Sequence, residues 1–194
     1  MNCKEALAYV KEILPERRYE HTLGVVETAK SLAEKHGEDV TKAEMAAILH
    51  DIAKHHSRDD MKKIIEQENF DSRLLLFHHE LWHAPVGAYL AKVTLNIESQ
   101  DVLNAIRYHT TGRANMSLLE KIIYLADYIE PGRKFSGVEE VRALAHEDME
   151  KALRKAVKQS ILFLLQKKQR IFPDTLECYN DVMLQKEKDK YEPN

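Results

Sequence analysis

Residues 41–51 of the chain are Thr-Lys-Ala-Glu-Met-Ala-Ala-Ile-Leu-His-Asp, an apolar helical segment that ends in two adjacent polar residues. Thr41 and Glu44 have the spacing of a capping box, so we expect a helix to begin at Thr41. That helix carries His50 and Asp51 into the interior, where a polar side chain is costly unless it has a partner. The segment therefore predicts a helical fold built around a buried polar site.

The rest of the chain also has the pattern of helices. Gly and Pro are scarce, at 6 and 5 of 194 residues, and alternating runs of Val, Ile and Thr are rare. We predict one all-α domain over residues 1–194, with a core at about 18–133 and C-terminal helices at about 139–186. Apolar spacing and capping residues place the other helices at about 3–13, 15–36, 57–65, 85–93, 99–109, 117–129 and 139–168, with a last helix from 173. Residues 70–83 are ambiguous, and the charged end from Lys186 to Asn194 is expected to fray.

Composition restricts the functional class. A net charge of −3 gives no overall attraction for nucleic acid. Cys3 and Cys178 stand far apart and form no Cys-x-x-Cys pair, which favours a reducing compartment. No run approaches the roughly 18 apolar residues of a membrane span, and the N-terminus has no apolar signal region. We therefore expect a cytoplasmic protein without nucleic-acid or membrane partners.

Several residues that can bind a metal lie on apolar helix faces. His21 shares a face with Val25 and Leu32, and both His109 and Asp127 lie on similar apolar stripes. Any one of them alone is equally well explained as a core residue that bonds to the backbone. Several from separate helices favour a shared metal site.

The donor types narrow the metal. Imidazole nitrogens together with carboxylate oxygens suit Fe, Mn, Zn or Co better than Ca or Mg, which prefer oxygen ligands. Asp51 follows His50 directly and has two carboxylate oxygens, so it could bridge two ions.

Basic residues beside these positions suggest a phosphorylated substrate. Arg18 stands one turn before His21, Lys54 follows Asp51, and Arg133 follows the helix of Asp127. A metal flanked by Arg and Lys is what phosphoryl transfer requires, because charge spreads over the phosphate oxygens. For Lys54 and Arg133 a solvated surface charge is an equally good explanation.

With these residues in view, the chain resembles the HD-domain phosphohydrolases, and most of all the YqeK family of bacterial hydrolases, which split diadenosine tetraphosphate into two ADP. The resemblance rests on five matching segments, at residues 18–25, 49–54, 81–85, 106–112 and 125–133. It implies a single HD-type helical bundle with a metal site between helices.

The resemblance also implies roles for individual residues. Iron, or a similar transition metal such as Mn, Co or Zn, would bind His21, His50, Asp51 and Asp127, as one or two ions. Asp51, His83 and His109 would be catalytic, with both histidines facing the substrate phosphates or a second metal. Substrate contacts would also come from Arg18, Lys54, Thr110 and Arg133, and from Arg170, Phe172, Asp174 and Thr175 in the segment 170–175.

The expected function is metal-dependent, symmetrical hydrolysis of diadenosine tetraphosphate. A homodimer is the expected assembly. Other functions stay open at this point. The same ligands would serve a nucleotidase or a nucleoside-triphosphate hydrolase, and a non-catalytic helical module could keep the site to sense nucleotides. A nucleic-acid-binding helical protein is disfavoured by the acidic net charge.

Overall fold

The structure is a computed structural model that describes the backbone of residues 1–191 and the side chains of residues 1–184. Residues 1–191 form helices joined by short connections and contain no strand, which confirms the all-α prediction. The α-helices are α1 (Cys3–Ile13), α2 (Glu16–His36), α3 (Val40–Leu49), α4 (Arg58–Gln67), α5 (His83–Val93), α6 (Gln100–Tyr108), α7 (Leu118–Ile129), α8 (Val138–Glu147), α9 (Met149–Gln166) and α10 (Pro173–Tyr191). Three short 3-10 helices are η1 (Ile52–His55), η2 (Ser72–Leu76) and η3 (His79–Leu81).

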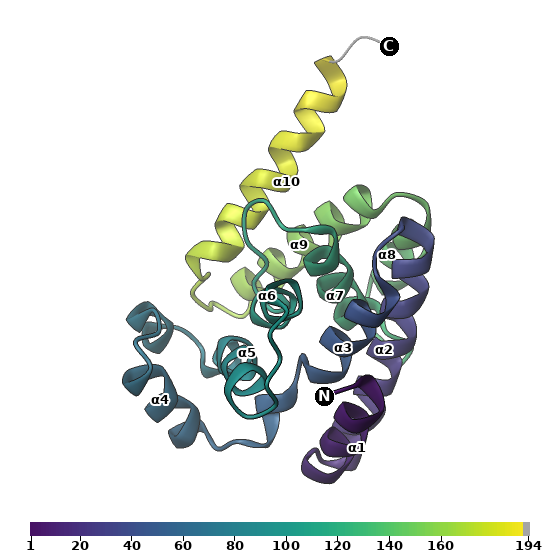
Figure 1. The fold of residues 1–194 in the computed structure, drawn as a ribbon. Coiled ribbons are helices and arrows are strands. Elements are labelled where there is room, and N and C mark those ends of the chain that lie inside the picture. The colour runs from purple at the N-terminus through teal and green to yellow at the C-terminus, as the bar shows by residue number, and fades with distance from the viewer. Residues whose placement is uncertain (192–194) are drawn as a thin grey trace.

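Helix α3 occupies the centre of the bundle (Figure 1). It packs against α1, α2, α6 and α7, and its Ala46, Ala47 and Leu49 are fully buried. Alanine side chains allow neighbouring helix axes to approach closely, so α3 can be surrounded on several sides. The C-terminal end of α3, with His50 and Asp51, therefore lies in the interior.

A second, smaller apolar cluster lies around α4, η2 and η3. Trp82 is 3% exposed in this cluster, and its indole N–H donates to the carbonyl oxygen of Leu74 at 2.8 Å. The segment before α10 joins the same cluster through Phe172, whose ring lies 5.1 Å from that of Phe77. Residues 70–83, ambiguous in sequence, thus contain the 3-10 helices η2 and η3, which pack beside Trp82 and hold the start of α10 near the core.

Most of the predicted helix ends agree with the structure. Ser57, Ser99 and Ser117 cap α4, α6 and α7, and Gly37 ends α2 in the left-handed conformation, with φ 78°. Helix α10 continues to Tyr191, so the backbone is helical through the first part of the end that was expected to fray. Residues 192–194 lie outside the described residues.

Two predicted helix starts are wrong. Helix α3 begins at Val40 because Asp39 caps it, its carboxylate accepting from the backbone N–H groups of Thr41 and Lys42, so Thr41 and Glu44 form no capping box. Helix α5 begins at His83, two residues before Pro85.

The expected single helix over residues 139–168 is two helices. Asp148 between α8 and α9 is extended, with φ −149° and ψ 95°, and its side chain accepts from Lys151 N–H at 2.9 Å. This cap starts a new helix, and α9 then packs against α8.

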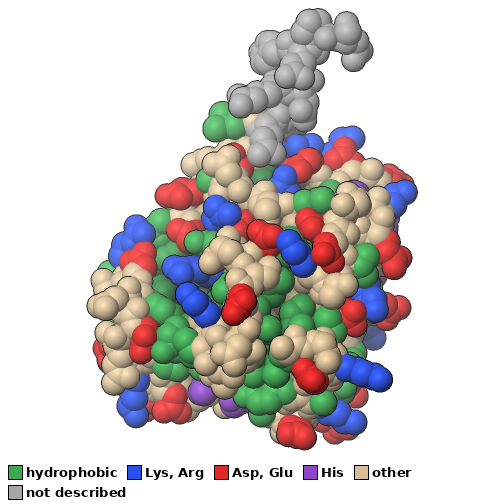
Figure 2. Space-filling model, in the orientation of Figure 1, with side chains coloured by type: hydrophobic (Ala, Val, Ile, Leu, Met, Phe, Trp, Pro, Cys, Tyr) green, Lys and Arg blue, Asp and Glu red, His purple; other side chains and the backbone are tan. Residues whose placement is uncertain are grey.

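The surface carries both signs of charge. Acidic and basic side chains are interspersed over the face shown in Figure 2, in keeping with a net charge of −3. In the described part of the chain, no helix has the length and apolar character needed to cross a membrane.

The turn after α6 gives the first testable prediction. Gly112 has φ 64°, and a Cβ added there would lie 2.6 Å from the sulfur of Cys178 on α10, whereas a Cβ on Gly37 would meet nothing within 4 Å. Gly37→Ala should therefore lower the free energy of unfolding by about 1 kcal/mol, from left-handed strain alone. Gly112→Ala should lose roughly 1–3 kcal/mol more, from overpacking against Cys178.

Urea unfolding of the two variants measures this difference. Equal losses for Gly37→Ala and Gly112→Ala would show that the turn does not pack against α10 as described.

Candidate metal centre

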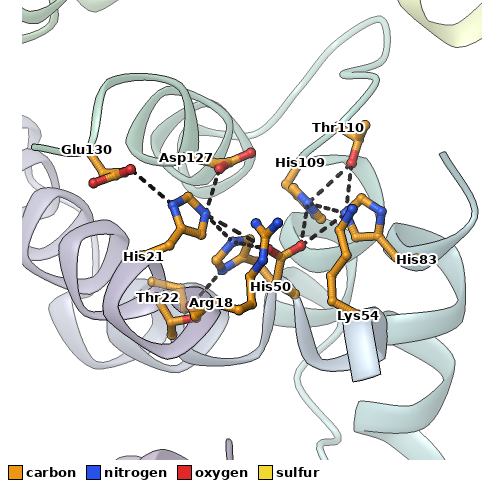
Figure 3. A network of polar contacts seen from close by, with 12 residues as sticks. Arg18, His21, Thr22, His50, Lys54, His83, His109, Thr110, Asp127 and Glu130 are labelled. Carbon is orange, nitrogen blue, oxygen red and sulfur yellow. Dashed lines mark hydrogen bonds and ion pairs between the residues drawn. The ribbon is translucent and has the colours of Figure 1, made fainter. Parts of the chain in front are cut away.

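The structure brings the predicted ligand residues together at the ends of several helices (Figure 3). His50 is the C-cap of α3 and Asp51 follows it, whereas His109 is the C-cap of α6. His83 is the first residue of α5. His21 in α2 and Asp127 in α7 complete the cluster, so residues separated by about a hundred positions meet at one place.

Three of the histidines are held in the same way. In each, ring nitrogen Nδ1 faces the backbone carbonyl oxygen three residues earlier, at 2.7 Å for His50, 2.6 Å for His83 and 2.7 Å for His109. A carbonyl oxygen only accepts hydrogen bonds, so Nδ1 carries the proton in all three rings. The second nitrogen, Nε2, therefore presents a lone pair to the interior in the neutral form.

His21 is oriented by a carboxylate instead. Its Nδ1 lies 3.1 Å from Oε1 of Glu130, which is 5% exposed, and Oε2 of Glu130 accepts from the N–H of Gly132. A Cβ on Gly24 would lie 2.7 Å from Oε2, so glycine is needed for the carboxylate to reach this position. Sequence reasoning missed Glu130, although it stands in the quoted segment 125–133, three residues after Asp127.

The four Nε2 atoms form two facing pairs. His21 Nε2 lies 3.3 Å from His50 Nε2, and His83 Nε2 lies 3.0 Å from His109 Nε2. Two nitrogen lone pairs at this distance repel one another unless a proton or a metal cation lies between them. Ligand atoms on one metal ion, at bonds of about 2 Å, lie roughly 3 Å apart, which matches both pairs.

Asp51 joins the two pairs. Its Oδ2 is 3.4 Å from His50 Nε2 and 3.8 Å from His21 Nε2, and its Oδ1 is 3.1 Å from His83 Nε2 and 3.8 Å from His109 Nε2. Each carboxylate oxygen of Asp51 thus lies next to one of the two histidine pairs. Asp127 adds an oxygen 3.0 Å from His21 Nε2. This set of nitrogen and oxygen donors fits a divalent transition metal, with Asp51 placed to touch a second ion.

The electrostatics of the cluster favour positive charge. Burial lowers the pKa of His50, but the Asp51 carboxylate outweighs burial and the pKa is raised. Burial raises the pKa of Asp51, yet His50 and His83 beside it hold that pKa well below its usual range. Burial and the neighbouring His83 and His50 lower the pKa of His109 to about 3, so His109 is neutral near pH 7 and its lone pair is free to bind a cation.

Two predicted substrate-binding arginines donate hydrogen bonds to Asp51 and Asp127. Arg18 Nη1 donates to Asp51 Oδ2 at 2.8 Å. Arg133 binds Asp127 through its side chain, and its Nε also donates to the Asp127 carbonyl oxygen at 2.9 Å. Both arginines therefore partly neutralise the acidic ligands and stand where a bound anion would meet them.

The remaining predicted residues divide between two places. Lys54 pairs with Glu80 near the cluster, and Thr110 Oγ1 lies 3.2 Å from His109 Nε2 and 3.4 Å from His83 Nε2. In the segment 170–175, Arg170 donates to the carbonyl oxygen of Leu76, Phe172 and Asp174 line a small cavity of about 40 Å³, and Thr175 is buried. That segment thus packs beside η2 and the end of α6.

Comparison with known proteins places the chain among metal-dependent hydrolases. The HD domain family model matches residues 18–132. The symmetrical bis(5'-nucleosyl)-tetraphosphatase of Bacillus subtilis is 54% identical over 93% of this chain and 97% of its own. That of Halalkalibacterium halodurans is 51% identical over 95% and 99%. A crystal structure from Clostridium acetobutylicum, described as a predicted HD superfamily hydrolase involved in NAD metabolism, superposes with a TM-score of 0.89 at 42% identity, covering 94% of this chain and 97% of that one.

Glu130 supplies the testable prediction of this site. Glu130→Ala leaves His21 without the acceptor that fixes its ring and its proton, so affinity for the metal should fall by about 10–100-fold. Glu130→Gln keeps an amide oxygen as acceptor and should lose less. Glu27→Gln, an exposed acid one helix turn beyond Gly24 on α2, is the matched control and should bind metal like the parent.

Competition with a chromophoric chelator measures these affinities directly. Unchanged metal affinity in Glu130→Ala would mean that His21 is not a ligand, or that Glu130 does not orient it.

Proposed function

Because this chain belongs to the HD domain family, and within it to the family of the symmetrical bis(5'-nucleosyl)-tetraphosphatases, we propose that it hydrolyses diadenosine tetraphosphate symmetrically into two ADP. The observation that carries the proposal is the convergence of four histidine Nε2 atoms on the two oxygens of Asp51, beside arginines that can meet phosphate.

The metal would be held by His21, His50, Asp51 and Asp127, whose donor atoms face one another. When bound, a divalent transition metal polarises a phosphate oxygen and lowers the pKa of water enough to make a nucleophile near neutral pH. We propose iron, since two imidazoles with two carboxylates suit it, and Mn, Co or Zn would fit the same donors. One or two ions can be accommodated, because Asp51 serves both histidine pairs.

The cationic side chains would bind the polyphosphate. Arg18 and Arg133 already donate to buried carboxylates, so each has a direction fixed by a charged hydrogen bond. A phosphate oxygen offers each guanidinium a further acceptor, and a planar guanidinium can bind carboxylate and phosphate at once. Lys54, at the edge of the cluster, would neutralise the charge that passes to the departing diphosphate.

His83, His109 and Thr110 would position the phosphate that is attacked. The two imidazoles lie together with the Thr110 hydroxyl, across the cluster from His21 (Figure 3). In the reaction the oxygen of water joins one of the two central phosphorus atoms, and the bridging oxygen leaves with the other ADP. This requires water and leaving oxygen to be in line, so the residues must fix which phosphorus sits at the metal.

The segment 170–175 would hold one nucleoside. Phe172 and Tyr108 supply rings, and Asp174 an acceptor, around the small cavity between this segment and α6. Burial raises the pKa of Asp174, which is consistent with a carboxyl placed away from bulk water. A homodimer and a cytoplasmic location are not tested by these observations and stay predictions.

Hydrolysis of diadenosine tetraphosphate in oxygen-18 water, followed by mass spectrometry, tests the function. The metal-loaded protein should give only ADP, half of it labelled, because water adds to one of two equivalent central phosphorus atoms.

AMP and ATP as products would contradict symmetrical attack. An intact dinucleotide, with rapid release of phosphate or pyrophosphate from mononucleotides, would show that the same site belongs to a nucleotidase instead.

A further inference from the structure

The described residues form two hollows of different character, of which only the second is lined by a histidine of the cluster. One is the small cavity of about 40 Å³ at Phe172, Tyr108 and Asp174. The other is a cleft of about 770 Å³ between the first half of α2 and the loop that follows α7. A volume of several hundred Å³ is typical of a site for a ligand of nucleotide size.

The cleft begins at the metal cluster and runs away from it. Arg18, His21, Lys54 and Arg133 line its inner end. Its outer wall is one face of α2, where Arg17, Glu20, Gly24 and Glu27 follow at helical spacings of three and four residues. The loop Glu130–Arg133 forms the opposite wall.

A symmetrical dinucleotide requires space on both sides of the bond that is broken. The central phosphates must lie beside the histidine cluster, so each half of the substrate extends away from the cluster in its own direction. The segment 170–175 is proposed to hold one nucleoside, and the nucleoside of the other half still has no place. The cleft opens directly from the cluster at His21.

We propose that this cleft binds the second nucleoside diphosphate, the half that departs, and that Arg17 contacts its outer phosphate. This inference rests on the proposed hydrolysis of a dinucleoside polyphosphate. The substrate is thus symmetrical, but its two halves are recognised by different chemistry.

Arg17 is suited to this part. It is exposed, and among the side chains of residues 1–184 no hydrogen bond or ion pair holds it, in contrast to Arg18 and Arg133. Its guanidinium is therefore available to a ligand without breaking an internal contact. It stands beside Arg18 in sequence, so it would extend the row of positive charge one phosphate further from the metal.

The lining of the cleft indicates how that half is recognised. Four cations line it, and none of the described residues around it is Phe, Tyr or Trp. Among the described residues, no aromatic ring is thus available for stacking in this cleft. The cleft therefore recognises the phosphates through charge, and Glu20 and Glu27 are placed to accept hydrogen bonds from ribose hydroxyls.

Charge reversal at Arg17 tests the inference. In the metal-loaded enzyme, Arg17→Glu should raise KM for diadenosine tetraphosphate about tenfold or more, because a charged contact is replaced by repulsion. Metal content and kcat should stay within about twofold, since Arg17 touches neither the ligands nor the reacting atoms. Inhibition by ADP should also change less than twofold, because ADP can still bind on the other side of the cluster, at His83, His109 and Thr110.

Lys35→Glu is the matched control, since it makes the same change of charge on the exposed surface of α2 outside the cleft. It should leave KM unchanged. If the parent enzyme hydrolyses the dinucleotide but Arg17→Glu and Lys35→Glu have the same KM, the inference is overturned. The inference is also overturned if Arg17→Glu weakens the binding of diadenosine tetraphosphate and of ADP by the same factor. A parent enzyme that leaves the dinucleotide intact overturns the proposed function, and this inference with it.

Discussion

The site depends on where four imidazole protons are held. His50, His83 and His109 each donate Nδ1–H to a carbonyl oxygen, and His21 faces the Glu130 carboxylate. The four Nε2 atoms face the same buried space, in two pairs separated by 3.3 Å and 3.0 Å. Those of His50, His83 and His109 present lone pairs whenever the rings are neutral. Such an arrangement is unfavourable without a cation, since lone pairs repel and Asp51 adds negative charge between them. The hydrogen bonding of the fold therefore makes the cluster suitable for a divalent metal.

The helices are arranged to satisfy that constraint. The carbonyl oxygens that accept from His50, His83 and His109 belong to the last turns of α3, η3 and α6, where a helix leaves its carbonyl groups without internal partners. One bond thus both completes a helix end and fixes the ring of a ligand. The alanine-rich α3 can be enclosed by α1, α2, α6 and α7, which brings Asp51 to the centre. Arg18 and Arg133 then offset the acidic ligands from the side on which the cleft opens.

Much of this could be predicted from the sequence because the ligands interrupt apolar helix faces. His21, His109 and Asp127 are recognisable in this way, and His50-Asp51 by its place at the end of an alanine-rich helix. Glu130 could not be found so, since its partner His21 is 109 residues away and Glu130 itself lies just past the end of α7. The break at Asp148 was also hidden, because apolar spacing continues across it and only a side-chain cap ends one helix and begins the next. Sequence indicates which residues face inward, but the partner of each polar atom depends on tertiary packing.

Anomalous diffraction from crystals of the metal-loaded protein, recorded at the absorption edge of the metal, tests the central claim most directly. The account predicts a metal peak within bonding distance of His21 Nε2, His50 Nε2, Asp51 and Asp127, with the Nδ1 bonds to Glu130 and Ala47 retained. A second peak, if two ions bind, should lie between His83, His109 and the other oxygen of Asp51. A metal bound elsewhere, with the Nε2 atoms of His21 and His50 still unligated, would contradict the account.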